Sequence, residues 1–170
     1  MRARVRSALR ILPLLLVVAG PLNGPAHAGP PEVVFVALGG ETFTLELALD
    51  PATRMHGLSG RGAIPRNGGM LFVQPRLQPM AMVMRDCPAP IDVAFLDADG
   101  RVLAVHEMAV EPPRAPGETP FAYEGRLRLY ASGAPARFAI ETAGGRLQEL
   151  GLAVGDRVPL DRESLIGRVR

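Results

Sequence analysis

The sequence predicts a mainly β fold: a single antiparallel β-barrel or sandwich-like domain with one or two short helices. Two observations carry this prediction. Apolar residues recur at alternate positions in runs of only four to eight residues, which is the period of a half-buried strand. The 170 residues include 19 Gly and 17 Pro and no Trp, so we expect short elements and many turns, and the composition argues against long helical bundles and coiled coils.

The first elements are two strands and a helix. Residues 32–38 and 42–49 alternate between apolar and polar side chains, and Gly39-Gly40 between them predicts a hairpin turn. Asp50-Pro51 then supplies an N-cap followed by Pro at the first helical position, and Gly57 is a stop signal. We therefore expect a short helix over residues 51–56.

The middle of the chain predicts four further strands. Residues 70–73 are an apolar run short enough to be a buried strand. Residues 80–84 read Met-Ala-Met-Val-Met, and a strand there would place all three Met on one face. Residues 92–96 and 101–108 flank Asp-Ala-Asp-Gly, which predicts a hairpin because Asp and Gly tolerate the positive φ of such turns.

The last third alternates loop and strand. Residues 111–120 are rich in Pro and Gly and predict a surface loop. Strands are expected at residues 126–130, 136–141 and 157–160, with a short helix over residues 146–150. The order of the strands in the sheet does not follow from this pattern.

Residues 1–28 have the three parts of a secretory signal peptide. Four Arg and no acidic residue precede the apolar run 11–19, and Ala26-His27-Ala28 forms a small-residue cleavage site. The run is about half of the ~20 residues that a membrane-spanning helix needs. The sequence therefore predicts a periplasmic or secreted protein with one globular domain, residues 29–170, and no transmembrane span after cleavage.

The charge of the mature chain argues against a nucleic-acid partner. Four of the 19 Arg lie in the leader and all 17 acidic residues follow it, which leaves a formal charge of −2. The remaining Arg are scattered among acids, whereas nucleic-acid binding needs a clustered basic face. Cys87 is the only cysteine, so no disulfide can form within the domain.

An ordered series of motifs runs through the mature chain. It includes Gly69-Met70-Leu71-Phe72, Ile91-Asp92 and Phe138-Ala139-Ile140-Glu141, with Arg54, Arg61, Met84 and Phe95 at matching spacing. This series resembles the domain of unknown function 192 family of bacterial and archaeal proteins over about residues 33–160. The resemblance implies a small, β-rich, often exported domain, and it implies no established activity.

Charged positions of the family pattern form the first candidate site. Arg54, Arg61 and Asp92 adjoin apolar runs, so one Arg is expected to pair with Asp92 and hold the 51–69 segment on the sheet. Alternatively, an unpaired Arg at a pocket mouth binds an anionic ligand such as a carboxylate or a sugar acid. The candidate cleft, for ligand binding or structure, comprises Arg54, Arg61, Met70, Met84 and Asp92.

A second hypothesis is Cu(I) handling in the cell envelope. Thioether and thiolate ligands select Cu(I), and the alternate methionines of residues 80–84 would present three sulfurs together. The candidate ligands are Met80, Met82, Met84, Cys87 and His106, with Met70 as a further donor. The competing interpretation is that these methionines fill a core poor in aromatic residues.

A third hypothesis is a hydrolase that uses Asp92 or Cys87. No G-x-S-x-G elbow or H-E-x-x-H motif is present, and no residue is assigned a catalytic role. No cofactor is required by the residues. We therefore expect a non-enzymatic exported domain that binds a small ligand or an envelope protein, with the copper and hydrolase interpretations as alternatives.

Overall fold

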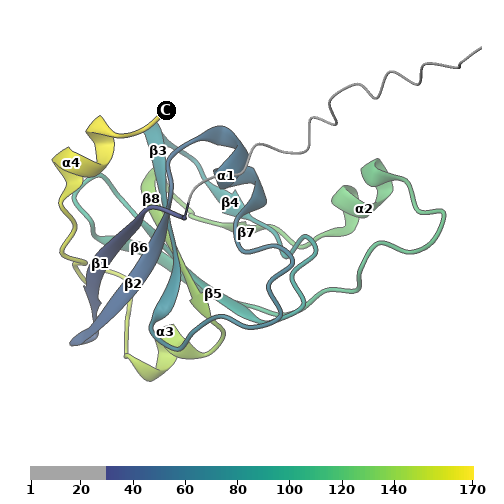
Figure 1. Cartoon of the computed structure of the whole chain (residues 1–170), viewed down its shortest axis with the longest axis horizontal. Coiled ribbons are helices and arrows are strands. Elements are labelled where there is room, and N and C mark those ends of the chain that lie inside the picture. Colours follow the sequence, from purple (N-terminus) through teal and green to yellow (C-terminus); the bar gives the residue numbers. More distant parts are fainter. Residues whose placement is uncertain (1–29) are drawn as a thin grey trace, which may run out of the picture.

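The computed structural model describes residues 30–170, and the predicted signal peptide, residues 1–28, lies outside the described residues. The fold is mainly β, with a six-stranded mixed sheet, a separate two-stranded sheet and four short helices (Figure 1). The six strands of the main sheet follow the order β1-β2-β3-β8-β5-β6. Their bounds are β1 Val33–Leu38, β2 Glu41–Ala48, β3 Gly68–Gln78, β5 Ile91–Leu96, β6 Val102–Met108 and β8 Ala136–Ala143.

The sheet differs from the expected antiparallel one at a single ladder. β2 and β3 are parallel, from Thr44 opposite Gly68 to Ala48 opposite Phe72, whereas the other ladders of the sheet are antiparallel. Helix α1 (Pro51–His56) and the loop after it carry the chain from the C-terminal end of β2 back to the opposite end of the sheet, where β3 begins, and a parallel pair requires such a crossover. Among the described residues β1 and β6 are not paired with each other, so the sheet does not close into a barrel.

The structure contains the turns and the helix cap that the local sequence signals predict. Helix α1 spans Pro51–His56, and the Asp50 carboxylate accepts a hydrogen bond from the Thr53 backbone N–H at 3.0 Å. The β1–β2 hairpin turns at Gly39-Gly40, both with positive φ. The β5–β6 turn is held by the Asp97 side chain, which accepts from the backbone N–H groups of Asp99 and Arg101.

Other elements depart from the predictions. The methionine segment forms only the two-residue strand β4 (Ala81–Met82), paired with β7 (Tyr130–Ala131). The expected strand at residues 126–130 is instead the end of helix α2 (Pro120–Arg126) and a linker into β7, and residues 157–160 contribute one isolated bridge. Helix α3 covers Arg146–Glu149 as predicted, while α4 (Arg162–Gly167) was not predicted.

Each face of the main sheet carries a hydrophobic core. The α4-side core is built from alternate residues of β1, β2, β3 and β8 and is covered by α4 and the 150–160 segment. The β4-side core is covered by the 57–64 loop, β4 and β7. Helix α2 and its flanking loops extend away from both cores (Figure 1). No helix among the described residues is long and apolar enough to cross a membrane.

Candidate functional site

A cavity of about 410 Å³ opens on the β4 side of the sheet. This volume is within the range of small-molecule sites. Helix α1 and the turn after it form one wall, the β4 segment forms the other, and side chains from β3 and β8 close it from the sheet side. The lining residues that matter below are Arg54, Met55, His56, Phe72, Met80, Met82, Arg85, Cys87 and Glu141.

Glu141 is the one acidic side chain that lines this cavity among the described residues. It lies on β8, directly opposite Met70 of β3 and Val93 of β5. The residue is only 6% exposed, and no side chain of the described region donates a hydrogen bond to its carboxyl group. Burial raises the pKa of Glu141 from 4.5 to about 8, against the opposing effects of Arg61 and the Leu58 backbone N–H. At neutral pH the group is therefore mainly a neutral carboxylic acid.

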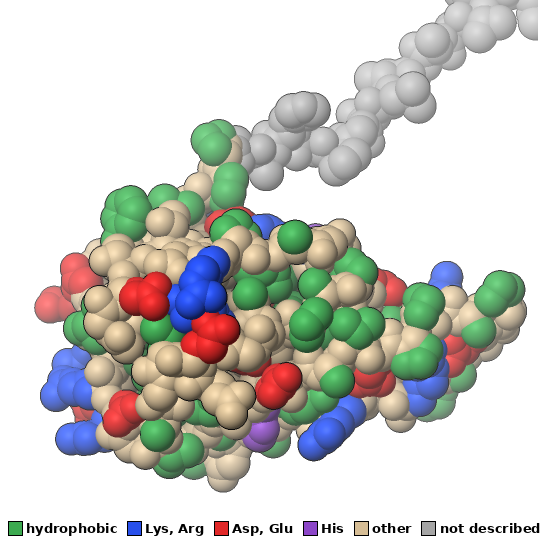
Figure 2. All heavy atoms as spheres, turned by 90° about the horizontal axis from the view of Figure 1, so that it is seen from below, with side chains coloured by type: hydrophobic (Ala, Val, Ile, Leu, Met, Phe, Trp, Pro, Cys, Tyr) green, Lys and Arg blue, Asp and Glu red, His purple; other side chains and the backbone are tan. Residues whose placement is uncertain are grey.

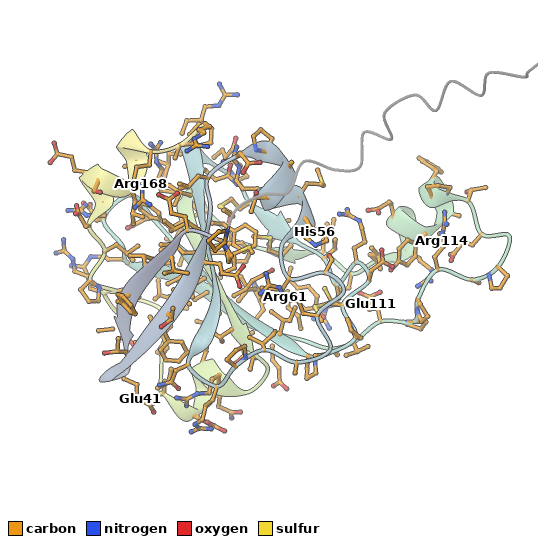
Figure 3. The ribbon with its side chains drawn as sticks, in the orientation of Figure 1. Glu41, His56, Arg61, Glu111, Arg114 and Arg168 are labelled. Atoms are coloured by element: carbon orange, nitrogen blue, oxygen red, sulfur yellow. The ribbon has the colours of Figure 1, made fainter. Side chains whose placement is uncertain are left out.

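Arg61 does not neutralise Glu141 because it is already paired. Its guanidinium donates two hydrogen bonds to the Glu46 carboxylate, at 2.5 and 2.6 Å. This pairing lowers the pKa of Glu46. Glu46 is on β2, opposite Met70 of β3, and Met70 in turn lies opposite Glu141 of β8. Figure 3 shows Arg61 beside the central strands, whereas Glu41 lies at the tip of the β1–β2 hairpin.

Two further cations border the cavity. The Arg54 guanidinium donates a hydrogen bond to the Val73 carbonyl at 3.2 Å and forms no salt bridge within residues 30–170. Arg85 is paired with Glu124 of α2, with one of the two contacts at 2.6 Å. Arg54 is therefore the cavity cation without an acidic partner among the described residues.

Cys87 lines the cavity as a protonated thiol. Its Sγ lies 3.3 Å from the Arg85 carbonyl oxygen, to which the S–H can donate. Burial, and then the nearby Glu141, raises the pKa of the thiol. A nucleophilic cysteine needs a lowered pKa, so the geometry gives the hydrolase hypothesis no activated thiol here.

Asp92 does not pair with an Arg, which corrects the sequence prediction. Its two carboxylate oxygens accept hydrogen bonds from the backbone N–H groups of Gly145 and Leu147, at 2.9 and 2.8 Å. The side chain thus caps α3, on the opposite face of the sheet from the cavity. Burial raises the pKa of Asp92, and these backbone hydrogen bonds oppose the increase. Its position marks Asp92 as a structural residue.

The predicted sulfur cluster is divided. Met80 and Met82 line the cavity together with Cys87. Met84 and Met70 are buried in the β4-side core without lining the cavity. Strand β4 covers only Ala81–Met82, so the alternation ends before Met84. His106 lies apart, with its ring against Phe95 and Tyr130 and its Nε2 at 2.8 Å from the Ala131 carbonyl oxygen. Within residues 30–170 no three His, Cys, Asp or Glu side chains converge on a metal-sized site.

Of the five residues in the predicted cleft, only Arg54 lines the cavity, and sequence reasoning missed Glu141. In the sequence, Glu141 stands out only as part of the family motif Phe138-Ala139-Ile140-Glu141, which assigns it no role. The signal that could have found it is the run Phe138-Ala139-Ile140-Glu141-Thr142, in which an acid occupies a strand position with apolar neighbours on both sides. The close approach of β3 is visible at Gly69, where a Cβ would lie 2.0 Å from the Glu141 carbonyl oxygen.

The fold and site define a small, mainly β domain with one buried acid in a cavity of ligand size. The DUF192 family, described as "Uncharacterized ACR", matches residues 34–160. The chain belongs to this family. No curated protein matches it.

Two solved structures are similar to the chain. A "putative transcription regulator" from Sinorhizobium meliloti 1021 is 28% identical, with a TM-score of 0.57 over 75% of this chain and 90% of that one. A protein of unknown function from Novosphingobium aromaticivorans DSM 12444 is 23% identical, with a TM-score of 0.62 over 83% of this chain and all of the other. The second likeness extends to the fold alone.

Proposed function

We propose that this protein is an exported, non-enzymatic domain that binds a small organic ligand in the Glu141 cavity. The observation that carries the proposal is a buried carboxylic acid that borders a ligand-sized space with no side-chain hydrogen-bond partner within residues 30–170. The Leu58 backbone N–H bonds to this carboxyl group, and a buried polar group whose remaining hydrogen-bonding capacity is unused lowers stability. A ligand that bonds to Glu141 would remove this cost, and binding sites commonly retain such groups.

The rest of the lining supports an organic ligand. Phe72, Met80 and Met82 offer apolar and polarisable surface, and Met adapts to varied shapes. Polar side chains accompany them, and two of these, Gln74 and Gln78, hydrogen-bond to each other at 2.9 Å. Small-molecule sites typically combine apolar walls with polar groups that orient the ligand.

Export is part of the proposal and rests on the leader. Residues 1–28 have the basic, apolar and small-residue parts of a signal peptide. We propose cleavage after Ala28 and a periplasmic or secreted location for residues 29–170. Mass spectrometry of the protein from the exported fraction should give a mature chain that begins at Gly29.

The name of the Sinorhizobium protein raises the question of DNA binding, which we do not propose for this chain. The mature sequence has a formal charge of −2. Figure 2 shows acidic and basic side chains interspersed on the face that carries α3, rather than a single basic patch. Several Arg are also committed to acids, among them Arg146, which bonds to Glu41 and Glu149. Phosphate binding would favour unpaired cations.

A fragment screen tests the proposal. Small neutral and charged aromatic fragments are titrated into the purified, isotope-labelled protein, and backbone amide shifts are followed by NMR. We expect shifts clustered on α1, β4 and residues 139–142. Ala81→Phe, at an exposed position that lines the cavity, should abolish them.

The matched control is Ala37→Phe, a change of the same size at an exposed position of β1 away from the cavity. It should leave fragment binding intact. The proposal is wrong if the fragments bind elsewhere or if Ala81→Phe binds them as well as the unaltered protein does.

A second candidate is Cu(I) binding by Met80, Met82 and Cys87, because all three line the same cavity. Thioether and thiolate sulfur are soft ligands that suit Cu(I). Titration with Cu(I) against a competing chelator under reducing conditions tests it. Met82→Leu should weaken binding, whereas Met84→Leu, a change in the buried core, should not.

A further inference from the structure

The charges around the cavity indicate which class of ligand it takes, an inference that rests on the proposed function. The lining contains two guanidinium groups and a single carboxyl group. Arg85 is compensated by Glu124, and Glu46 compensates Arg61. Arg54 remains, half-buried and with no salt bridge among the described residues. The local balance therefore favours an anion.

The hydrogen-bonding groups point the same way. A protonated Glu141 offers an O–H donor, and Arg54 has guanidinium N–H groups beyond the one used on Val73. The Ser59 hydroxyl and the Cys87 thiol are directed at the Arg85 carbonyl oxygen. The cavity thus offers free hydrogen-bond donors and no ionised acceptor at neutral pH. A carboxylate ligand, which only accepts hydrogen bonds, matches this set of groups.

The groups facing Glu141 from each packed element are consistent with this state. Glu46 and Arg61 form a closed pair on the β2 side, Cys87 contributes a neutral thiol, and α1 contributes Arg54 and His56. The β5 neighbour, Val93, is apolar. A buried acid can be kept protonated in apolar surroundings and then serves as a hydrogen-bond donor.

We infer that the cavity binds a small carboxylate with an apolar body, whose charge is met by Arg54 and which is hydrogen-bonded to the Glu141 carboxyl group. The apolar part would contact Phe72, Met80 and Met82. Ionisation of Glu141 would place a second negative charge beside the ligand. Affinity for a carboxylate should therefore fall as Glu141 loses its proton.

Three probes with the same ring and different charge test the inference: benzoate, benzylamine and benzyl alcohol. Their dissociation constants are measured by NMR titration of the purified protein at about pH 7, where the amine is a cation. Benzoate should bind most tightly and benzylamine least. Raising the pH to about 9.5 should weaken benzoate binding about tenfold or more, because each unit above the pKa of Glu141 leaves less of the protonated form.

Two substitutions separate the contributions. Arg54→Gln should weaken benzoate binding about tenfold, the usual scale for one charge-assisted hydrogen bond, and leave benzyl alcohol unaffected. Glu141→Gln keeps a donor and should remove the pH dependence of benzoate binding. Arg162→Gln, at a half-buried position of α4 that is paired with Asp99 away from the cavity, is the matched control and should alter neither.

The outcomes distinguish this inference from the proposed function. Equal binding of benzoate and benzyl alcohol, or tighter binding of benzylamine, overturns the carboxylate class while the cavity remains a binding site. Failure of benzoate to bind overturns the class even if other fragments bind. Failure of every fragment in the screen overturns the proposed function itself.

Discussion

The two faces of the main sheet differ in how completely they are packed. The α4-side core consists of closely packed Phe, Leu, Val and Ile side chains, with Phe43 and Phe138 fully buried. The β4-side core contains Met70, Met80 and Met84 and borders a cavity that holds a buried acid. Both faces of the sheet thus bury a core, and the β4-side face also carries the candidate site.

The covering elements explain the difference. Helix α4 buries Leu165 against the sheet, and the chain end is held where the Arg170 backbone N–H donates to the Leu49 carbonyl. Helix α1, by contrast, has no buried residue, and the β4 side is closed by a loop and a two-residue strand. A cover with few apolar contacts leaves space for a ligand and opens more readily.

The largest expected effect is on the α4 side. Phe138→Ala removes a fully buried ring and should lower the free energy of unfolding by about 3 to 5 kcal/mol. The matched control is Phe121→Ala on α2, where the side chain is 88% exposed and the change should stay within about 0.5 kcal/mol. Urea unfolding measures both, and similar losses would contradict the assignment of the core.

Asp92 should have the next largest effect. Asp92→Ala leaves two backbone N–H groups of α3 without their acceptors and should cost about 2 kcal/mol. Asp92→Asn should also destabilise, because one amide oxygen cannot replace two carboxylate oxygens. Urea unfolding gives the magnitudes, and a fragment titration should show unchanged binding, since Asp92 lies on the far face from the cavity. Loss of binding with full stability would make Asp92 functional.

Glu141 should make stability depend on pH. Its folded-state pKa of about 8 lies above the ordinary value of 4.5, so the folded protein keeps a proton that the unfolded chain releases. Its contribution to the free energy of unfolding is therefore full below about pH 4.5 and decreases as the pH rises to about 8.

Glu141→Gln should remove this decrease and be more stable than the unaltered protein, by an amount on the order of 2 kcal/mol at about pH 6 and more at higher pH. Urea unfolding at several pH values measures it. Glu118→Gln, in the loop before α2, is the control, because the hydrogen bond with Arg126 lowers the pKa of Glu118. The contribution of Glu118 to stability is therefore lost as the pH falls, not as it rises. Parallel pH profiles for the unaltered protein and Glu141→Gln would refute the account.

The smallest expected effect tests the electrostatic coupling between the strands. Glu46→Gln breaks the bidentate pair with Arg61, a half-buried interaction, at a cost of about 1 kcal/mol. The freed guanidinium should then stabilise ionised Glu141 and lower its pKa. NMR titration of Glu141 in this variant measures the change, and an unaltered midpoint would show that Arg61 does not act on Glu141.

The sequence predicted those elements whose signals are local. Asp50-Pro51, Gly39-Gly40 and the Asp97 turn fix their own backbone conformation, so α1 and both hairpins lie where expected. Family membership was also predicted correctly. The parallel β2–β3 pair was missed because strand order depends on contacts between distant segments.

The site was only partly predictable for the same reason. Arg54 was identified from the sequence. That Arg61 is paired with an acid within the described residues, and Arg54 is not, depends on the contact between Arg61 in a loop and Glu46 on a strand 15 residues earlier. The cavity joins α1, β4 and β8, and the burial of Glu141 exists only when these segments meet. The methionine pattern misled because β4 ends after two residues.

The most direct test of the account is the titration of Glu141 itself. The side-chain carboxyl carbons of Glu are followed by 13C NMR across the pH range, and Glu141→Gln identifies the resonance. The account predicts a midpoint of about 8, shifted upward when benzoate is bound. A midpoint near 4.5, the ordinary value for Glu, would mean that the cavity holds an ionised carboxylate and would contradict the central claim.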